Sequence, residues 1–164
     1  MVCENFKHID PDEFHGREIT LHDCVANHIS FENHALRFFL PDGIWITPHH
    51  EENSCGATVR SGAAEVIFST KDIDEITVRV FSERTCCRRR KVRVEDWHME
   101  QLIEAVNSGK CTWQFIAQYR SHDEQMWYCV IHSKKKPYYR ECQLYLPETR
   151  ATFFWSDLRP DRKW

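Results

Sequence analysis

The chain has 164 residues, of which 41% are hydrophobic, 13% aromatic and 29% charged. This length predicts one domain spanning residues 1–164, long enough to bury roughly two thirds of the surface that the unfolded chain would expose. The composition excludes an intrinsically disordered chain, and the lack of any apolar run of roughly 18 residues excludes a membrane-spanning helix.

The formal net charge of −3 is unevenly distributed along the chain. Residues 1–75 hold 14 Asp and Glu against 5 Lys and Arg, whereas residues 76–164 hold 11 Asp and Glu against 17 Lys and Arg. The two halves either present faces of opposite sign or interleave so that their charges cancel locally, and we expect the second arrangement.

Eight cysteines are present, yet the first ten residues, MVCENFKHID, lack the basic and apolar segments of a secretory signal. We therefore expect a cytoplasmic protein with reduced thiols. Cys24, Cys129 and Cys142 lie in apolar strand-like runs, where a free thiol acts as a small hydrophobic side chain.

The segment from Leu21 to Thr47 has the clearest pattern, with three β-type runs separated by turn signals. Its second turn ends in Gly43, which can adopt a positive φ. Alternation along the strands predicts a core-facing set of Val25, Ile29, Phe31, Leu36, Phe38, Leu40, Ile44 and Ile46. The opposite set of His22, His28, Phe39 and Trp45 is the better place to look for a binding function.

Further strands are predicted along the rest of the chain. Residues 64–69 and 75–82 are expected to form a hairpin across the turn at residues 71–74, followed by a short strand through Val92 and Val94. Four more strands are expected at residues 113–119, 125–132, 138–146 and 151–155. The sequence thus predicts about nine strands in two antiparallel meanders, forming one sheet or a partly open barrel.

One helix is predicted, at residues 96–108. Its apolar residues follow helical spacing and form a stripe of Met99, Leu102, Ile103 and Val106. Glu95 or Asp96 can cap its start, and Gly109 supplies a stop. The expected fold class is α+β, with this helix on one face of the sheet. Residues 1–20 are interpreted as an N-terminal arm, and residues 156–164 as an irregular tail.

The loop from His49 to Cys55 contains imidazole, carboxylate and thiol groups, which are ligands for transition metals. Its spacing matches no metal motif, because neither C-x-x-C nor H-E-x-x-H occurs in the chain. We therefore predict a solvated loop, with no metal and no cofactor.

His22 and Asp23 carry the groups of a general acid–base pair. Neighbouring residues on a strand point to opposite faces, so we expect that the two side chains do not contact each other. No nucleophile or phosphate-binding motif is present, and no catalytic residue is assigned. An enzyme remains an alternative if a pocket joins His22, Asp23, His28 and the loop at His49.

Two basic runs lie in the second half of the chain. The first is Arg88, Arg89, Arg90 and Lys91, and the second is Lys134, Lys135 and Lys136. If both lie on one face with Trp127, Tyr138 and Tyr139 between them, they could neutralise phosphates while the rings stack on bases. The favoured interpretation is that they are solvated hairpin ends.

The aromatic content exceeds what one small core normally takes, with six Trp and five Tyr. Such rings anchor protein interfaces or line ligand pockets. The candidate binding residues are therefore His22, His28, Phe39, Trp45, Trp127, Tyr138 and Tyr139.

The opening strands carry Leu21-His22-Asp23-Cys24, then Ile29-Ser30-Phe31, Leu36-Arg37-Phe38 and Asp42-Gly43. In these residues the chain resembles the start of several small bacterial β-rich families, among them some immunity proteins of polymorphic toxin systems. Hypothetical proteins of gut clostridia look similar over a longer span. The resemblance implies a cytoplasmic protein that blocks a partner, and it assigns no functional residue.

The sequence therefore favours a non-enzymatic binding protein that inhibits or neutralises another protein. The acidic first half suits a basic partner, because complementary charge steers association. The alternatives are a small-ligand-binding domain with an aromatic cleft, and nucleic-acid contact through the basic runs at residues 88–91 and 134–136. The pattern assigns no oligomeric state.

Overall fold

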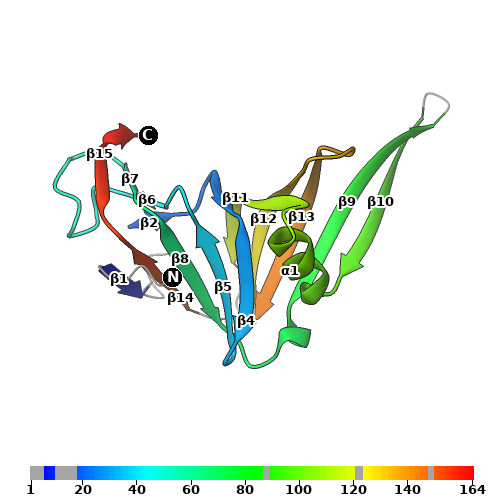
Figure 1. The fold of residues 1–164 in the computed structure, drawn as a ribbon, viewed down its shortest axis with the longest axis horizontal. Coiled ribbons are helices and arrows are strands. Elements are labelled where there is room, and N and C mark those ends of the chain that lie inside the picture. The colour runs from blue at the N-terminus through cyan, green and yellow to red at the C-terminus, as the bar shows by residue number, and fades with distance from the viewer. Residues whose placement is uncertain (1–5, 10–17, 87–88, 121–123, 148–149) are drawn as a thin grey trace.

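The computed structural model describes residues 6–9, 18–86, 89–120, 124–147 and 150–164. Over these residues the protein is β-rich, with antiparallel strands in three sheets and one α-helix (Figure 1). No helix in the described part of the chain is long and apolar enough to cross a membrane. The coarse prediction of a β-rich α+β fold is confirmed. The strands are more numerous than predicted, and in the described part of the chain they form three sheets, none of which is closed.

The five-stranded sheet has the order β1-β14-β8-β5-β4. Its strands are β1 (Phe6–Ile9), β14 (Ala151–Trp155), β8 (Ala64–Ser69), β5 (Ala35–Leu40) and β4 (His28–Glu32). Neighbouring strands in this order come from distant parts of the chain, so most of the pairings are long-range.

The six-stranded sheet has the order β10-β9-β13-β12-β11-β3. Its strands are β10 (Arg89–Trp97), β9 (Thr77–Cys86), β13 (Tyr139–Pro147), β12 (Glu124–Ser133), β11 (Cys111–Arg120) and β3 (Cys24–Ala26). A four-stranded sheet, β15-β7-β6-β2, contains β15 (Leu158–Lys163), β7 (Val59–Ser61), β6 (Trp45–Ile46) and β2 (Ile19–Thr20).

Aromatic rings join the five-stranded and six-stranded sheets in the core. The ring of Phe38 on β5 lies 5.1 Å from that of Phe115 and 6.1 Å from that of Trp113, both on β11. Phe68 on β8 meets Trp127 on β12 at 6.0 Å. The Phe38–Phe115 and Phe68–Trp127 pairs are edge-to-face, and such pairs add about 0.5–1.5 kcal/mol each to the stabilisation from burial.

The helix α1 (Met99–Asn107) buries Met99, Leu102 and Val106, as the predicted stripe requires. Its start differs from the prediction, because β10 continues through Trp97 and places Glu95 and Asp96 in a strand. The residue before the helix is His98, whose backbone N–H donates to the Gln101 side chain at 2.9 Å. The backbone pairing of β10 with β9 therefore overrides the capping preference of the two acids.

The last helical residue, Asn107, fixes the helix against the edge of the five-stranded sheet. Its Oδ1 accepts a hydrogen bond from the Ile29 N–H at 2.9 Å, and its Nδ2 donates to the Ile29 carbonyl at 2.7 Å. The amide thus replaces a neighbouring strand for one residue of β4.

The predicted inward face of the first strand is wrong at its beginning. Cys24 and Ala26 are buried and Val25 is half-buried, whereas Ile29 is buried as predicted. The alternation restarts at Asn27, because β3 belongs to the six-stranded sheet and β4 to the five-stranded one. Of the other predicted core residues, Phe31 is half-buried, and a fully buried set comprises Leu36, Phe38, Leu40, Ile44 and Ile46.

The predicted hairpin between residues 64–69 and 75–82 does not form. β8 pairs with β5 and β14, while β9 pairs with β10 and β13. The segment between them contains a 3₁₀ turn, η1 (Ile73–Glu75), begun by the Asp72 carboxylate, which accepts from the Asp74 N–H. This turn sends the chain from one sheet to the other.

The two chain ends also differ from the prediction. The expected irregular tail forms β15, which pairs with β7, because backbone pairing does not require an alternating side-chain pattern. Within the expected N-terminal arm, residues 6–9 and 19–20 are strands β1 and β2, while residues 1–5 and 10–17 lie outside the described part.

The turn glycine Gly43 has a φ of +81°, as the sequence predicted. A Cβ there would collide with the carbonyl oxygens of Gly62 and Ser61. We expect Gly43→Ala to lower the free energy of unfolding by about 2–4 kcal/mol, through strain and overpacking together. The matched control is Gly56→Ala, because Gly56 has a φ of +64° but open space around it. Gly56→Ala should lower the free energy of unfolding by only about 1 kcal/mol. Urea unfolding measures both variants, and an equal loss of stability in the two would contradict the steric explanation.

Asn107→Ala should lower the free energy of unfolding by about 1–3 kcal/mol, because it leaves the backbone groups of the buried Ile29 without partners. Glu104→Ala on the exposed side of the same helix is the control, since it removes only an exposed ion pair with Lys110 and should cost about 0.5 kcal/mol or less. Chemical denaturation of both variants measures the difference. An Asn107 variant as stable as the Glu104 variant would show that the amide does not fix the helix.

Candidate functional site

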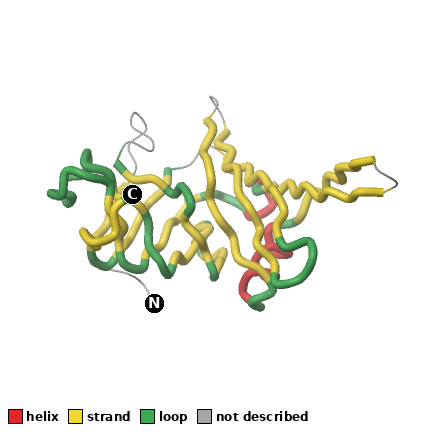
Figure 2. The backbone as a smooth tube through the Cα atoms, turned by 90° about the horizontal axis from the view of Figure 1, so that it is seen from above, coloured by secondary structure: helices red, strands yellow, loops and turns green. Residues whose placement is uncertain are grey.

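A two-stranded arm projects from the six-stranded sheet. β9 pairs with β13 only from Thr77 to Val80, but it pairs with β10 from Val78 to Cys86. The outer parts of β9 and β10, residues 81–86 and 89–94, therefore have only each other as strand neighbours among the described residues, and we call them the arm. Both views show the arm extending away from the rest of the molecule (Figures 1 and 2).

The second predicted basic run lies beside the base of the arm. Residues 134–138 connect β12 to β13, are all exposed, and are called the lysine turn. The Ser133 N–H donates to the Tyr138 carbonyl at 2.7 Å and closes this turn. Because β13 is the sheet neighbour of β9, the lysine turn and the arm flank the same space.

A cleft of about 510 Å³ separates the arm from the lysine turn, and we call it the arm cleft. It is lined by Phe81, Glu83, Arg90, Val92, Pro137, Tyr138, Tyr139, Arg140 and Glu141. Val92, Tyr138 and Tyr139 are 59%, 58% and 67% exposed, which is unusual for large apolar or aromatic side chains. A second hollow of about 540 Å³ is lined by Arg93, Glu95 and Lys136, and shares Arg140 with the first.

The arm cleft itself is lined by two cations, Arg90 and Arg140, and by two acids, Glu83 and Glu141. The excess of positive charge lies in the arm and the lysine turn around it. The described cations of the arm, the lysine turn and the start of β13 are Arg90, Lys91, Arg93, Lys134, Lys135, Lys136 and Arg140. Two of them form ion pairs, Arg90 with Glu83 at 3.6 Å and Arg93 with Glu95 at 2.7 Å. Exposed pairs of this kind contribute little to stability, so both arginines can exchange their partners at low cost.

Arg140 is the most constrained of these cations. Its guanidinium lies 4.7 Å from the centre of the Trp97 ring, and its Nε is buried without a hydrogen-bond acceptor. An unsatisfied buried donor costs about 1–3 kcal/mol, and an anionic group entering either hollow could accept from this arginine. Arg140 was missed in the sequence because it is a single cation in an alternating strand.

The predicted basic surface is thus partly formed. The structure brings Arg90, Lys136, Tyr138 and Tyr139 to the two hollows beside the arm. Trp127 does not belong to it, because that ring is 6% exposed and packs in the core. Arg88 and the side chain of Arg89 lie outside the described part.

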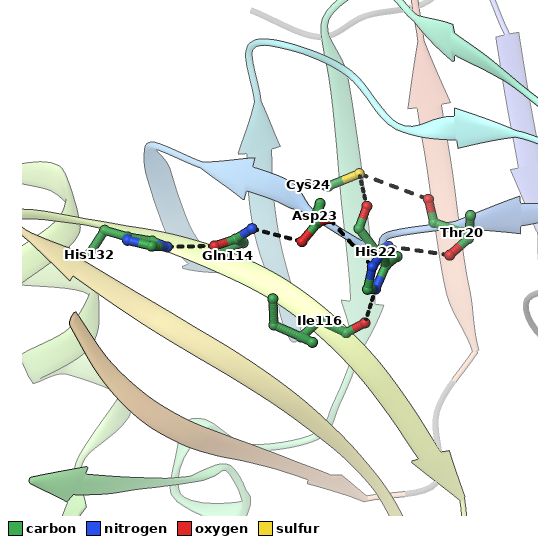
Figure 3. Close-up of polar contacts among 7 residues, drawn as sticks. All are labelled: Thr20, His22, Asp23, Cys24, Gln114, Ile116 and His132. Atoms are coloured by element: carbon green, nitrogen blue, oxygen red, sulfur yellow. Dashed lines mark hydrogen bonds and ion pairs between the residues drawn. The ribbon is translucent and has the colours of Figure 1, made fainter. Parts of the chain in front are cut away.

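The structure also corrects the prediction for His22 and Asp23. Asp23 has a φ of +57°, which ends the strand geometry, so His22 Nε2 lies 3.4 Å from Asp23 Oδ2 (Figure 3). His22 Nδ1 donates to the Ile116 carbonyl at 2.6 Å, and Gln114 Nε2 donates to Asp23 Oδ1 at 2.9 Å. Gln114 also contacts His132, so the network ties the β2–β3 loop to β11 and β12.

This network is poorly suited to acid–base catalysis. Both ring nitrogens of His22 already face a protein oxygen, which leaves neither free to exchange a proton with a substrate. The adjacent pocket, of about 230 Å³, is lined by His22 and Trp127 but by neither His28 nor His49. His28 and His49 are both exposed.

The remaining predicted binding residues fall into two separate places. His28 lies opposite Phe39 in the β4–β5 pair. Trp45 on β6 is covered by the Arg60 guanidinium at 4.5 Å and by the Trp164 ring at 5.3 Å, and Trp164 also stacks on His22. The contacts of Trp164 could not be anticipated, because residues 156–164 show no periodic hydrophobic pattern.

The loop from His49 to Cys55 is organised by Asn53. Its buried side chain donates to the carbonyls of Ile46 and Ala57, both at 2.9 Å. The ring of His50 is buried and lies 5.3 Å from that of Trp155. Among the residues that the structure describes, no three His, Cys, Asp or Glu side chains are grouped so that they could hold a metal ion.

Burial controls the chemistry of the strand cysteines. Cys24, Cys129 and Cys142 are free and buried, as predicted. Loss of hydration raises the pKa of the Cys24 thiol to about 12 and also raises the pKa of Cys129 and Cys142. These thiols therefore stay protonated at neutral pH, which makes them poor nucleophiles and poor metal ligands.

Comparisons with protein-family models, curated proteins and solved structures found no match. The resemblance to immunity proteins therefore stays a prediction.

Alkylation by iodoacetamide of the folded protein near pH 8 should modify the partly exposed Cys55 well before Cys24, Cys129 or Cys142. The reason is that burial both blocks access and keeps the three strand thiols protonated. Peptide mass spectrometry measures the extent at each site, with guanidinium-unfolded protein as the control in which all four react. Equal rates in the folded protein would contradict the buried-core assignment.

Proposed function

We propose that this protein is a non-enzymatic binding protein, which blocks a partner protein by binding an anionic side chain of that partner in the arm cleft. The observation that carries the proposal is the orphaned Nε of Arg140 between two hollows that lie beside the cationic lysine turn. A carboxylate of the partner would accept from Arg140 and restore the missing hydrogen bond.

The composition of the arm cleft supports a protein partner. Arginine and tyrosine are enriched among the residues that dominate binding energy at interfaces, and they act best in desolvated pockets. Tyr138, Tyr139, Arg90 and Arg140 provide this combination around one cleft. The exposed Val92 adds apolar surface that a partner would cover.

The surface proposed here is basic, so the proposed partner surface is acidic. The sequence had favoured a basic partner because the first half of the chain is acidic. Four of those acids, Glu4, Asp10, Asp12 and Glu13, lie outside the described residues, so that part of the expectation stays a prediction.

Single-stranded nucleic acid is the second candidate. The specific observation in its favour is that the exposed Tyr138 and Tyr139 follow three exposed lysines, with only Pro137 between them. The lysines are Lys134, Lys135 and Lys136. Lysines neutralise phosphates, and exposed rings stack on unpaired bases.

Arg140→Gln should weaken binding of the partner at least about tenfold, because a hydrogen bond to a charged group contributes about 1.5–3 kcal/mol. The measurement is affinity capture from a lysate of the producing cells by the wild-type protein and by this variant, with and without nuclease treatment. The matched control is Arg120→Gln, which removes an exposed arginine at the end of β11 and should bind as the wild type does.

Each outcome of this capture experiment is informative. A protein that resists nuclease, is retained by the wild type and is lost from the Arg140 variant would support the proposal. Retention that disappears with nuclease would favour nucleic acid instead. Retention of a small molecule without a macromolecule would favour the ligand-binding alternative. Equal retention by the wild type and the Arg140 variant would contradict any role of the arm cleft.

The nucleic-acid candidate makes a separate prediction. Wild-type protein should bind a single-stranded oligonucleotide, with affinity falling steeply as salt rises, because bound phosphates release counterions. The double variant Lys135→Glu/Lys136→Glu should reduce both the affinity and the salt slope. A filter-binding titration measures both quantities, and a lack of binding at low ionic strength would remove this candidate.

A further inference from the structure

The outer strand of the arm leaves one edge open. β10 is the terminal strand of the six-stranded sheet and pairs with β9 along all nine of its residues. Its other edge has no strand neighbour among the described residues. In an antiparallel sheet every second residue directs its N–H and C=O groups to the same edge, so β10 offers a row of backbone groups to another strand.

The charges along β10 are ordered. Arg90 and Lys91 stand near its start, Glu95 and Asp96 near its end, and the middle is Val92-Arg93-Val94. Val92 and Val94 are 59% and 52% exposed, although β-branched apolar residues are usually covered in sheets. An antiparallel copy of the strand would therefore bring its acids to the bases of the first.

We propose that a second copy of this chain pairs with β10 edge to edge, antiparallel about a two-fold axis that passes through Arg93. This register places Arg90 opposite Asp96, Lys91 opposite Glu95, and Val92 opposite Val94, with each contact made twice. Opposite charges and apolar pairs directly across a strand pair are each favourable. A two-fold interface in which one patch meets itself is the commonest form of protein self-association.

The geometry of strands limits the competing registers. Outward-pointing backbone groups recur every second residue, so a self-paired strand can shift only until the two-fold axis passes through a neighbouring residue. With the axis at Val92, Lys91 lies opposite Arg93, which juxtaposes like charges twice. With the axis at Val94, Arg93 lies opposite Glu95, but Val92 lies opposite Asp96 and Lys91 opposite Trp97. Of these three registers, only the axis at Arg93 places Val92 opposite Val94 and both Arg90 and Lys91 opposite acids.

The central contact in this register is tolerable although it places Arg93 opposite its own copy. Arg93 Nη2 lies 2.7 Å from Glu95 Oε1 in the same chain, so each copy contributes a neutralised pair to the centre. The carboxylates of Glu95 thereby lie near Arg93 of their own chain and Lys91 of the other.

The self-association depends on a different structural feature from the proposed function, although Arg90 and Val92 belong to both. It uses the backbone edge of β10, whereas partner binding uses the arm cleft. Val94 lies opposite Phe81 and Val92 opposite Glu83 in the β9–β10 pair, so these side chains share the face of the sheet that bears the arm cleft. Two copies paired in this register would present two arm clefts on the same face of one continuous sheet.

Analytical ultracentrifugation of the full chain tests the proposal. The unmodified protein should have twice the chain mass of 19.7 kDa. Lys91→Glu and Glu95→Lys should each reduce the mass to that of one chain, because each variant places like charges opposite one another. An equimolar mixture of the two variants should recover the doubled mass, since positions 91 and 95 are both acidic in the first variant and both basic in the second.

Two further variants keep the result decisive. Lys135→Glu makes the same charge change in the lysine turn and should leave the doubled mass intact. The double variant Lys91→Glu/Glu95→Lys restores complementarity within one chain and should also have the doubled mass, with circular dichroism confirming the fold of each protein. A single-chain mass for the unmodified protein, a doubled mass for Lys91→Glu alone, or a mixture that remains at single-chain mass would overturn the proposal.

Discussion

The functional geometry depends on how far β13 extends along β9. Their pairing joins Thr77–Val80 to Cys142–Tyr145 and then ends, while β9 continues with β10 to Cys86. The chain enters β13 near this point through the lysine turn instead of extending the sheet. The end of this pairing therefore creates the arm and opens the arm cleft beside it, where Arg140 lies between two hollows without an acceptor for its Nε.

The strands themselves were more predictable than their partners. Alternation located β11, β12, β13 and β14 within a few residues, and helical spacing located the buried stripe of α1. Alternation could not indicate that β14 pairs with β8 in the five-stranded sheet, because a half-buried strand has the same pattern whichever sheet it joins. Asn27 shows the same limit, since the strand changes sheets there with no turn signal to mark it.

The candidate site was predictable only where charge is concentrated. Of the two basic runs, Arg90 and Lys136 line the hollows of the proposed surface, and the exposed Tyr138 and Tyr139 also belong to it. Phe81, Val92 and Arg140 were missed because apolar and single charged residues in a strand are normally explained by packing. Conversely, Trp127 was assigned to a binding surface because aromatic composition cannot distinguish a ring in the core from an exposed one.

The most direct test of the central claim is an NMR titration that follows the backbone amides of the ¹⁵N-labelled protein. The ligands are a glutamate-rich peptide and, separately, a single-stranded oligonucleotide at low salt, each of which supplies anionic groups. We predict that shifts produced by at least one of these ligands concentrate at Arg90–Val92 and at residues 136–141, and that Arg140→Gln diminishes them. Shifts centred on the His22 network or on β4 and β5, or shifts unchanged in the variant, would contradict this prediction.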